Sequence, residues 1–430
     1  MFCYKKEYSA HFKYGFGEYK LKVVVVNNGM PHYYNYVLSR LNRVPGIELL
    51  LVVPAGTGRN IEEGVYQTKE GVNFRVCELK EFSLFNIYRS FRGLAKLLAE
   101  EKPSAVFLSE LYLFGFMFNI PVLLVMKTFG IKLILRSIPF RLLSYNDARI
   151  QIKNWPSGGD ASRGPWWLNT LLLRTVVIKL LRRIVLEGRR IAFNMADAHV
   201  CYVDEAVDLY GTYGVPKEKI FVARNSPDTD MLLNIRESLK SVAPILPACD
   251  HRLIHAGRLV DWKRVDLLLK AFARVRRQFN DAELITIGSG PREEELKALS
   301  AKLGIERDVR FLGAIHDPRL LGQYLLSASI YVLAGMGGLS INDAMCFGLP
   351  IICSVCDGTE KKLVRDGVNG KYFMEGNEDD LVAKIVYIFN NPDLRRQMGM
   401  NSTEIIRNEI NIHTVIAGYL DALQFTQGSK

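Results

Sequence analysis

The sequence predicts an α/β protein made of two doubly wound, parallel-sheet domains that face each other across a cleft. Apolar runs such as residues 20–27 (KLKVVVVN) alternate with segments of helical periodicity, the pattern of a parallel sheet covered by helices. The alternation pauses at 242–250, a segment with two prolines, and then starts again. A length of 430 residues also favours two domains of about 200 residues each over a single core.

The first domain is expected over residues 19–241, after an N-terminal extension at 1–18. Strands are predicted at 20–27, 47–54, 72–78, 105–108, 132–136, 198–202 and 220–223, with helices at 31–41 and 87–101. The uncharged run 111–126 has 16 residues, fewer than the roughly 20 that a membrane-spanning helix needs. Asn119 and Pro121 also interrupt it, so we expect a buried helix there.

Residues 141–190 are predicted to form a basic insert in the first domain. The part at 146–165 is polar and rich in Gly, Ser and Pro, which predicts a mobile loop, and 166–190 predicts one long helix. A helical wheel gives this helix a basic half (Arg174, Lys179, Arg182, Arg183, Arg189, Arg190) and an apolar half (Leu173, Val176, Val177, Leu180, Leu181, Ile184). Two interpretations stay open. The apolar half packs on the sheet, or the helix lies on a membrane surface with Trp166 and Trp167 as anchors.

The positive charge of the chain is concentrated in and around this insert. The whole chain has a net charge of +11, and residues 127–190 contain 13 Lys and Arg against 3 acidic residues. Nucleic acid, an anionic membrane surface or a phosphorylated substrate would each suit such a segment. The aromatic interleaving typical of single-strand binding is not apparent, so no nucleic-acid partner is expected.

The second domain is expected over residues 242–400, followed by helices at 401–430. Its strands are predicted at 253–256, 282–287, 309–312, 331–333 and 351–354, and its helices at 265–279, 292–303, 318–327 and 340–347. The N-terminal 20 residues do not have the pattern of a signal peptide, and the seven cysteines have irregular spacing. We therefore expect free thiols in a reducing, cytoplasmic compartment, and Cys353 and Cys356 form an isolated C-x-x-C pair.

Candidate ligand-binding residues follow the predicted strands of the second domain. The stretch 331–352 is a strand, a loop with Gly335, Gly337 and Gly338, and a helix that starts near Ser340. Backbone N–H groups of such a loop and helix start bind anions or polar sugars, and Asp343 lies in the first turn. After the strand at 253–256, Gly257 is followed by Arg258 and, five residues later, Lys263, two cations suited to a diphosphate. Gly288 and Gly290 form another glycine turn after the next strand.

The first domain offers fewer candidates. Asn28, Gly29 and His32 come directly after its first strand and should face the cleft, because ligands bind beyond the carboxyl ends of parallel strands. For His32, a local hydrogen bond at a helix start and contact with an acceptor substrate are both open.

The order of these pieces closely resembles the C-terminal half of glycosyltransferase family 4. The matching segments are G-R-L…K (257–263), I-G-S-G-P (287–291), F-L-G (311–313), G-L-S-I-N-D-A-M (338–345) and D-G-V-N-G (366–370). ARNSPD (223–228) resembles the Asn-containing segment before the linker in that family, whereas the first half is similar only in architecture. The resemblance implies the GT-B fold, in which two Rossmann-like domains face across a cleft.

The resemblance also implies residue roles. Arg258 and Lys263 would bind the diphosphate of a nucleotide-sugar donor and stabilise the leaving nucleoside diphosphate, which makes them the expected catalytic residues. The expected donor site consists of Gly257, Gly288, Gly290, Gly335, Met336, Gly337, Gly338, Leu339, Ser340 and Asp343. No metal or other cofactor is expected, since two fixed cations serve that purpose and the chain has no D-x-D motif.

The chain departs from the family pattern at two places. Of the family's paired glutamates, the second corresponds to Asp343, where it would hold the ribose hydroxyls, and the first corresponds to Gly335. Backbone N–H groups of 336–339 would then hold the sugar and phosphate. In the first domain, Arg136 or Ser137 stands where many relatives have a histidine.

These implications predict a retaining hexosyltransferase. It would move a sugar from a nucleotide-diphosphate donor to a lipid-linked glycan acceptor in cell-surface polysaccharide or lipopolysaccharide biosynthesis. It would work at the cytoplasmic face of the plasma membrane, with 166–190 on the anionic surface. A non-catalytic nucleotide-sugar-binding relative and a GT-B epimerase or phosphorylase are the alternatives.

Overall fold

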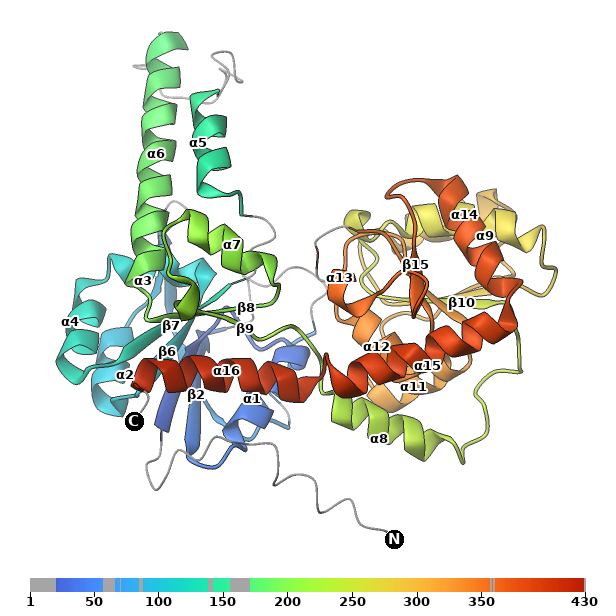
Figure 1. The fold of residues 1–430 in the computed structure, drawn as a ribbon, viewed down its shortest axis with the longest axis horizontal. Coiled ribbons are helices and arrows are strands. Elements are labelled where there is room, and N and C mark those ends of the chain that lie inside the picture. The colour runs from blue at the N-terminus through green and yellow to red at the C-terminus, as the bar shows by residue number, and fades with distance from the viewer. Residues whose placement is uncertain are drawn as a thin grey trace.

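A computed structural model describes residues 21–56, 66–69, 71–84, 88–137, 142–154, 171–355, 358 and 360–428. The predicted extension at 1–18, Trp166, Trp167 and Cys356 lie outside these residues. The chain forms two α/β bodies side by side, each built around a parallel sheet (Figure 1).

The first body contains a seven-stranded sheet in the order β3-β2-β1-β6-β7-β8-β9, and every neighbouring pair is parallel. Its strands are β1 (Leu21–Val26), β2 (Ile47–Pro54), β3 (Arg75–Leu79), β6 (Ala105–Ser109), β7 (Lys132–Ser137), β8 (Ala198–Cys201) and β9 (Ile220–Val222). Its helices include α1 (His32–Asn42), α2 (Leu94–Glu101), α7 (Glu205–Thr212) and the 3-10 turn η4 (Lys217–Lys219). Apolar clusters cover both faces of the sheet, which explains why β1 and β2 are nearly continuous apolar runs.

The second body contains a six-stranded sheet in the order β12-β11-β10-β13-β14-β15, again parallel throughout. Its strands are β10 (Arg252–Ala256), β11 (Glu283–Ile287), β12 (Val309–Phe311), β13 (Ile330–Leu333), β14 (Ile351–Cys353) and β15 (Gly370–Tyr372). Its helices are η5 (Asp261–Lys263), α9 (Val265–Arg276), α10 (Glu293–Lys302), α11 (Pro318–Leu326), α12 (Ser340–Cys346), α13 (Glu360–Leu363), α14 (Glu378–Phe389) and α15 (Pro392–Asn408).

The strand orders fix where a ligand can bind. In each sheet the sequence order reverses at a single position, between β1 and β6 in the first sheet and between β10 and β13 in the second. Crevices open at the carboxyl ends of the strands at such switch points. The segments that follow these strands line a shared cleft.

The chain crosses between the two bodies twice, and α8 (Thr229–Leu239) and α16 (Ile412–Gln427) mark the crossings. α8 packs against α11 and α12, so the first crossing falls at 223–228, before the predicted linker at 242–250. α16 crosses back and packs on β7, β8 and β9 (Figure 1). Its buried Ile416, Tyr419 and Leu420 belong to the core of the first body. Each such side chain contributes roughly 1.5–3 kcal/mol relative to an exposed one.

Two predicted helices of the first domain are wrong in part. Within the predicted helix 87–101, Tyr88–Phe91 form a strand, β5, which pairs with β4 (Glu81–Leu84), and only Leu94–Glu101 form a helix, α2. The run 111–126 is not one buried helix, because η1 (Glu110–Tyr112) and α3 (Leu113–Met117) are followed by α4 (Ile120–Phe129) at a bend of 92°. Asn119 caps α4 by accepting a hydrogen bond from the N–H of Val122. Ile120 in α4 is 66% exposed.

The described part of the basic insert forms an arm that projects from the first body (Figure 1). Residues 146–153, predicted as part of a mobile loop, belong to helix α5 (Tyr145–Lys153), which packs along α6 (Leu171–Met195). In α6 the apolar side chains of Val176, Leu180, Leu181 and Ile184 are 60%, 56%, 56% and 58% exposed. The interpretation in which these side chains pack on the sheet is therefore wrong.

Within the described residues, no individual helix has both the length and the hydropathy of a membrane span. The bent pair Glu110–Met117 and Ile120–Phe129 reaches that level only when both helices are taken together.

Candidate active site in the cleft between the two domains

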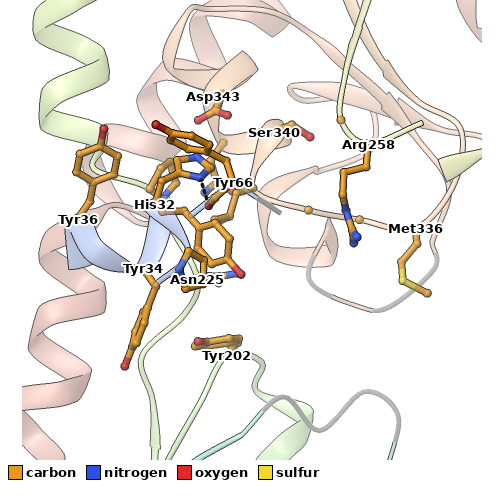
Figure 2. A pocket seen from close by; sticks show the side chains of 18 of the residues that line it. His32, Tyr34, Tyr36, Tyr66, Tyr202, Asn225, Arg258, Met336, Ser340 and Asp343 are labelled. Carbon is orange, nitrogen blue, oxygen red and sulfur yellow. Dashed lines mark hydrogen bonds between the residues drawn. The ribbon is translucent and has the colours of Figure 1, made fainter. Parts of the chain in front are cut away.

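A cleft of about 1130 Å³ separates the two bodies and is lined by both. Figure 2 shows its side chains: His32, Tyr34, Tyr36, Tyr202 and Asn225 come from the first body, and Arg258, Met336, Ser340 and Asp343 from the second. We call the second-body wall, where the sequence predicts the donor, the donor side, and the first-body wall, where it predicts the acceptor, the acceptor side.

Both predicted cations reach the donor side. Arg258 follows Gly257 at the carboxyl end of β10, and its guanidinium lies 5.4 Å from the ring centroid of Trp262. The ammonium of Lys263 donates hydrogen bonds to the carbonyl oxygens of Met336 and Gly337, at 2.9 and 2.7 Å. Lys263 thus ties η5 to the glycine loop and places a positive charge where that loop meets the cleft.

The glycine loop itself only partly matches the prediction. Met336, Gly337, Gly338, Leu339 and Ser340 line the cleft, whereas Gly335 is not among its lining residues. The N–H of Met336 is not available to a ligand in this structure, because it donates to the carbonyl oxygen of Trp262 at 2.7 Å.

Gly335 has a packing role. A Cβ atom on this residue would lie 2.2 Å from the carbonyl oxygen of Trp262 and 2.7 Å from the carbonyl carbon of Lys263. Because those atoms are backbone, they cannot move aside as a flexible side chain does. The backbone of η5 therefore leaves no room for the carboxylate that the family has at this position.

Asp343 lies on α12 and lines the cleft as predicted. Burial raises the pKa of its carboxyl to about 7. Ser340, at the start of the same helix, accepts a hydrogen bond from the hydroxyl of Tyr331 at 2.7 Å. The Tyr331 hydroxyl also lies 3.0 Å from the carbonyl oxygen of Ala256, so one buried side chain links the ends of β10 and α12.

The two remaining donor-side glycines allow loops to touch backbone to backbone. A Cβ on Gly288, whose φ is +137°, would lie 1.9 Å from the carbonyl oxygen of Gly257. A Cβ on Gly290 would lie 2.4 Å from the carbonyl oxygen of Leu259. Gly257 and Gly288 line the cleft, whereas Gly290 does not line it and packs closely against the backbone of Leu259.

On the acceptor side, Asn28, His32, Arg136 and Ser137 line the cleft, whereas Gly29 is not a lining residue. Arg136 donates to Oδ1 of Asn27 at 2.7 Å and to the hydroxyl of Tyr202 at 3.0 Å.

The ring of Tyr34 lies 3.9 Å below the Arg136 guanidinium. Ser137 hydrogen-bonds to the hydroxyl of Tyr210.

Aromatic side chains bring the two walls into contact. Tyr66 of the first body stacks on His316 of the second, with ring centroids 4.0 Å apart and planes 15° apart. Nδ1 of His32 lies 3.4 Å from the carbonyl oxygen of Tyr66. Burial lowers the pKa of His32, and the nearby His316 lowers it further, while the Tyr66 carbonyl raises it.

An ion pair between Lys362 and Asp204, at 2.9 Å, also joins the two bodies. The cleft is therefore bridged at two places.

Sequence reasoning missed many residues of the cleft, among them the aromatic side chains of Tyr34, Tyr36, Tyr66, Tyr202, Trp262 and His316. The segment HYYNY at 32–36 carried a signal, since it directly follows the first strand. Tyr202 carried a similar signal, since it ends the predicted strand 198–202. Tyr66 and His316 carried none, because only the tertiary fold brings their loops to the cleft. A search of the described residues reveals no group of three or more His, Cys, Asp or Glu side chains suited to a metal.

Comparison with known proteins is consistent with this site. Residues 245–405 match the family of glycosyl transferases group 1. An uncharacterized glycosyltransferase of Haemophilus influenzae is 32% identical over 167 residues, which are 38% of this chain and 46% of that protein. Phosphatidyl-myo-inositol mannosyltransferase of Mycobacterium leprae is 29% identical over 149 residues, 34% of this chain and 38% of that protein. The chain thus spans less than half the length of these curated relatives.

The crystal structure of Anabaena HepE in complex with UDP superposes with a TM-score of 0.60 at 15% identity, over 92% of this chain and 97% of that one. The structural likeness extends over both bodies, whereas the family match at residues 245–405 lies in the second. The chain therefore has the GT-B fold of two Rossmann-like domains, and its residues 245–405 match the glycosyl transferases group 1.

Proposed function

We propose that this protein is a retaining hexosyltransferase that moves a sugar from a nucleotide-diphosphate donor to an acceptor hydroxyl on a lipid-linked glycan. The observation that carries the proposal is the donor wall, where Arg258 and Lys263 stand at the carboxyl end of β10 next to the glycine loop that follows β13. Two cations at a switch point suit the diphosphate of a donor and the negative charge that develops as it leaves.

The geometry suggests a role for each group. Arg258 would hold the diphosphate, and Lys263 would stabilise its charge from the loop side. Asp343 would accept hydrogen bonds from the ribose hydroxyls. In a retaining reaction the acceptor hydroxyl would attack the sugar on the same face from which the nucleoside diphosphate leaves. The oxygen of the departing phosphate would take the proton of that hydroxyl. The Tyr66–His316 stack would help exclude water from the closed cleft.

The acceptor proposal draws on the composition of the arm and on the relatives. α6 carries exposed apolar side chains together with basic ones, which suits a surface of anionic lipids. One relative is by name a mannosyltransferase acting on phosphatidyl-myo-inositol, an anionic lipid. Synthesis of a cell-surface polysaccharide or lipopolysaccharide at the inner face of the membrane is the setting we propose.

A thermal-shift screen tests the donor site. UDP-, GDP- and ADP-sugars would each be added to the full chain, with a CMP-sugar, which has one phosphate, for comparison. At least one of the diphosphate sugars should raise the melting temperature, because a bound ligand stabilises the folded state. A donor at 100 times its Kd stabilises by about 2.7 kcal/mol. Arg258→Gln should abolish this shift, whereas Arg277→Gln, on the exposed end of α9, should leave it intact. If no nucleotide-sugar shifts the parent, the donor assignment is wrong.

A flotation assay tests the proposed binding of the arm to anionic membranes. The variant with Arg174, Lys179, Arg182 and Arg183 replaced by Gln should bind anionic vesicles more weakly than the parent and neutral vesicles equally. Equal binding of anionic vesicles by both proteins would refute the proposed membrane binding.

One observation favours a second candidate, a nucleotide-sugar-binding protein without transferase activity. The position of the family's first glutamate is Gly335, and the adjacent backbone excludes a carboxylate there. A donor that stabilises the protein, combined with neither transfer nor slow hydrolysis of its sugar, would support this candidate.

A further inference from the structure

We propose that one face of α6, from Ile178 through Leu181 and Val185 to Arg189, is the binding track for a phosphate-bearing lipid acceptor. The apolar chain would lie along Ile178, Leu181 and Val185, and the phosphate would be held by Arg189 and Arg136. The inference rests on the proposed function and deepens it, since it names the acceptor class and the residues that hold it.

Helix geometry connects this face to the cleft. Val185 and Arg189 line the acceptor side. At about 100° per residue, Leu181, Ile178 and Arg189 all lie within about 40° of Val185 around the helix axis. The cleft wall therefore continues outward along the arm for two turns. Ile178, Leu181 and Val185 are 40%, 56% and 36% exposed, so the continuation is apolar and accessible.

Other sides of α6 meet the neighbouring helices. The ammonium of Lys179 donates to the carbonyl oxygen of Lys153 at 2.8 Å, and Glu187 accepts from the hydroxyl of Tyr145 at 2.5 Å, which places α5 about 120–160° away from Val185. Gly188 faces Phe114 of α3, since a Cβ there would lie 3.3 Å from the Phe114 ring. The track thus runs between α3 and α5.

Where the track reaches the cleft, it is lined first by apolar side chains and then by basic ones. Leu111, Leu113 and Phe114 line the cleft from η1 and α3, on the same wall as Val185. A chain of methylene or isoprene units that left the membrane along α6 would stay in contact with apolar side chains up to the cleft. A free glycan is polar and would not bind to exposed leucines along this route, whereas an apolar chain would.

The charges at the inner end suit a phosphate. The partners of Arg136 are Asn27, Tyr202 and the ring of Tyr34, all neutral, so its positive charge is not neutralised by a carboxylate among the described residues. Arg189 shares its wall with Glu110, whose pKa is raised by burial and lowered by Arg189. Two guanidinium groups against one carboxylate leave this wall positive.

Arg224 and Lys362 also line the cleft, but both pair with Asp204, at 2.8 and 2.9 Å. Arg136 and Arg189 are therefore the groups that we assign to the acceptor phosphate.

Farnesyl phosphate is a suitable probe, because it combines a short prenyl chain with one phosphate. Its affinity for the full chain would be measured by calorimetry beside that of farnesol and of inorganic phosphate. We expect farnesyl phosphate to bind at least tenfold more tightly than either. Leu181→Ser should weaken its binding about tenfold, the loss of one partly buried leucine contact.

Leu180→Ser is the matched control. Leu180 is as exposed as Leu181, at 56%, but points to the other side of α6, so its replacement should change the affinity less than twofold. Arg136→Gln and Arg189→Gln should each weaken farnesyl phosphate tenfold and leave farnesol unchanged, and melting curves would check that each variant is folded.

Equal effects of Leu180→Ser and Leu181→Ser would mean that α6 is only a membrane anchor and would overturn the track. Farnesyl phosphate binding no better than inorganic phosphate would overturn it as well. Both outcomes differ from failure of the proposed function, which is the absence of any shift with nucleotide-sugars.

Discussion

Replacing Gly335 by Ala tests whether this residue is a packing element or a position from which a functional carboxylate has been lost. The new methyl group would lie 2.2 Å from the carbonyl oxygen of Trp262, well inside van der Waals contact, and under 3 Å from two backbone atoms of Lys263. The same oxygen accepts the hydrogen bond from the N–H of Met336, so relief of the clash also breaks that bond.

The magnitude follows from the two costs together. Overpacking costs about 1–3 kcal/mol, and a lost hydrogen bond in a partly buried site about 1 kcal/mol. The sum of roughly 2–4 kcal/mol should lower the melting temperature of the second domain by about 4–16 °C, since 1 kcal/mol shifts a domain of this size by about 2–4 °C. Gly335→Glu, which adds the family's carboxylate, should be at least as destabilising and should not improve donor binding.

The assay is a thermal melt with and without the stabilising nucleotide-sugar. Gly211→Ala is the control, because a Cβ there meets nothing within 4 Å and Ala favours a helix over Gly. If Gly335→Ala melts within 1 °C of the parent, or if Gly335→Glu binds the donor more tightly, the packing explanation is wrong.

Three further changes probe other parts of the site. Lys263→Gln should abolish the donor-induced shift and lower the melting temperature of the ligand-free protein, because the hydrogen bonds to the glycine loop are weakened. If the donor-induced shift is lost while the ligand-free melting temperature is unchanged, Lys263 does not hold the glycine loop in place. For Asp343, burial raises the folded-state pKa to about 7, above the unfolded value near 4, so the folded state binds more protons between these pH values and stability should fall as pH rises from about 4 to 7. Urea unfolding across that range should show a smaller fall for Asp343→Asn, and identical pH profiles would refute the assignment. Gly418→Val should weaken the packing of α16 on the first body, since a Cβ there would lie 2.5 Å from the Cα of Ala223. We expect faster proteolysis of the C-terminal helix in this variant, and an unchanged rate of proteolysis would argue against the contact.

The sequence determined most of the sheet framework, because buried parallel strands are the part of a fold that local composition encodes best. The runs at β1 and β2 are apolar on both faces, and the predicted strand 47–54 coincides with β2. It also placed Arg258, Lys263, Ser340 and Asp343 at strand ends or helix starts, from which the topology brings them into one cleft.

The tertiary structure decided what depends on approach between distant segments. Gly335 packs against the backbone of η5, because a Cβ there would lie only 2.2 Å from the carbonyl oxygen of Trp262. The sequence does not encode this distance between two loops, so it could not show whether Gly335 contacts a ligand or η5. The stack of Tyr66 on His316 joins residues 250 positions apart. The sequence indicates that α6 is amphipathic, but only the fold shows that this helix projects from the first body and that one of its apolar faces leads into the cleft. Helical periodicity shows which residues share a face and not what that face contacts.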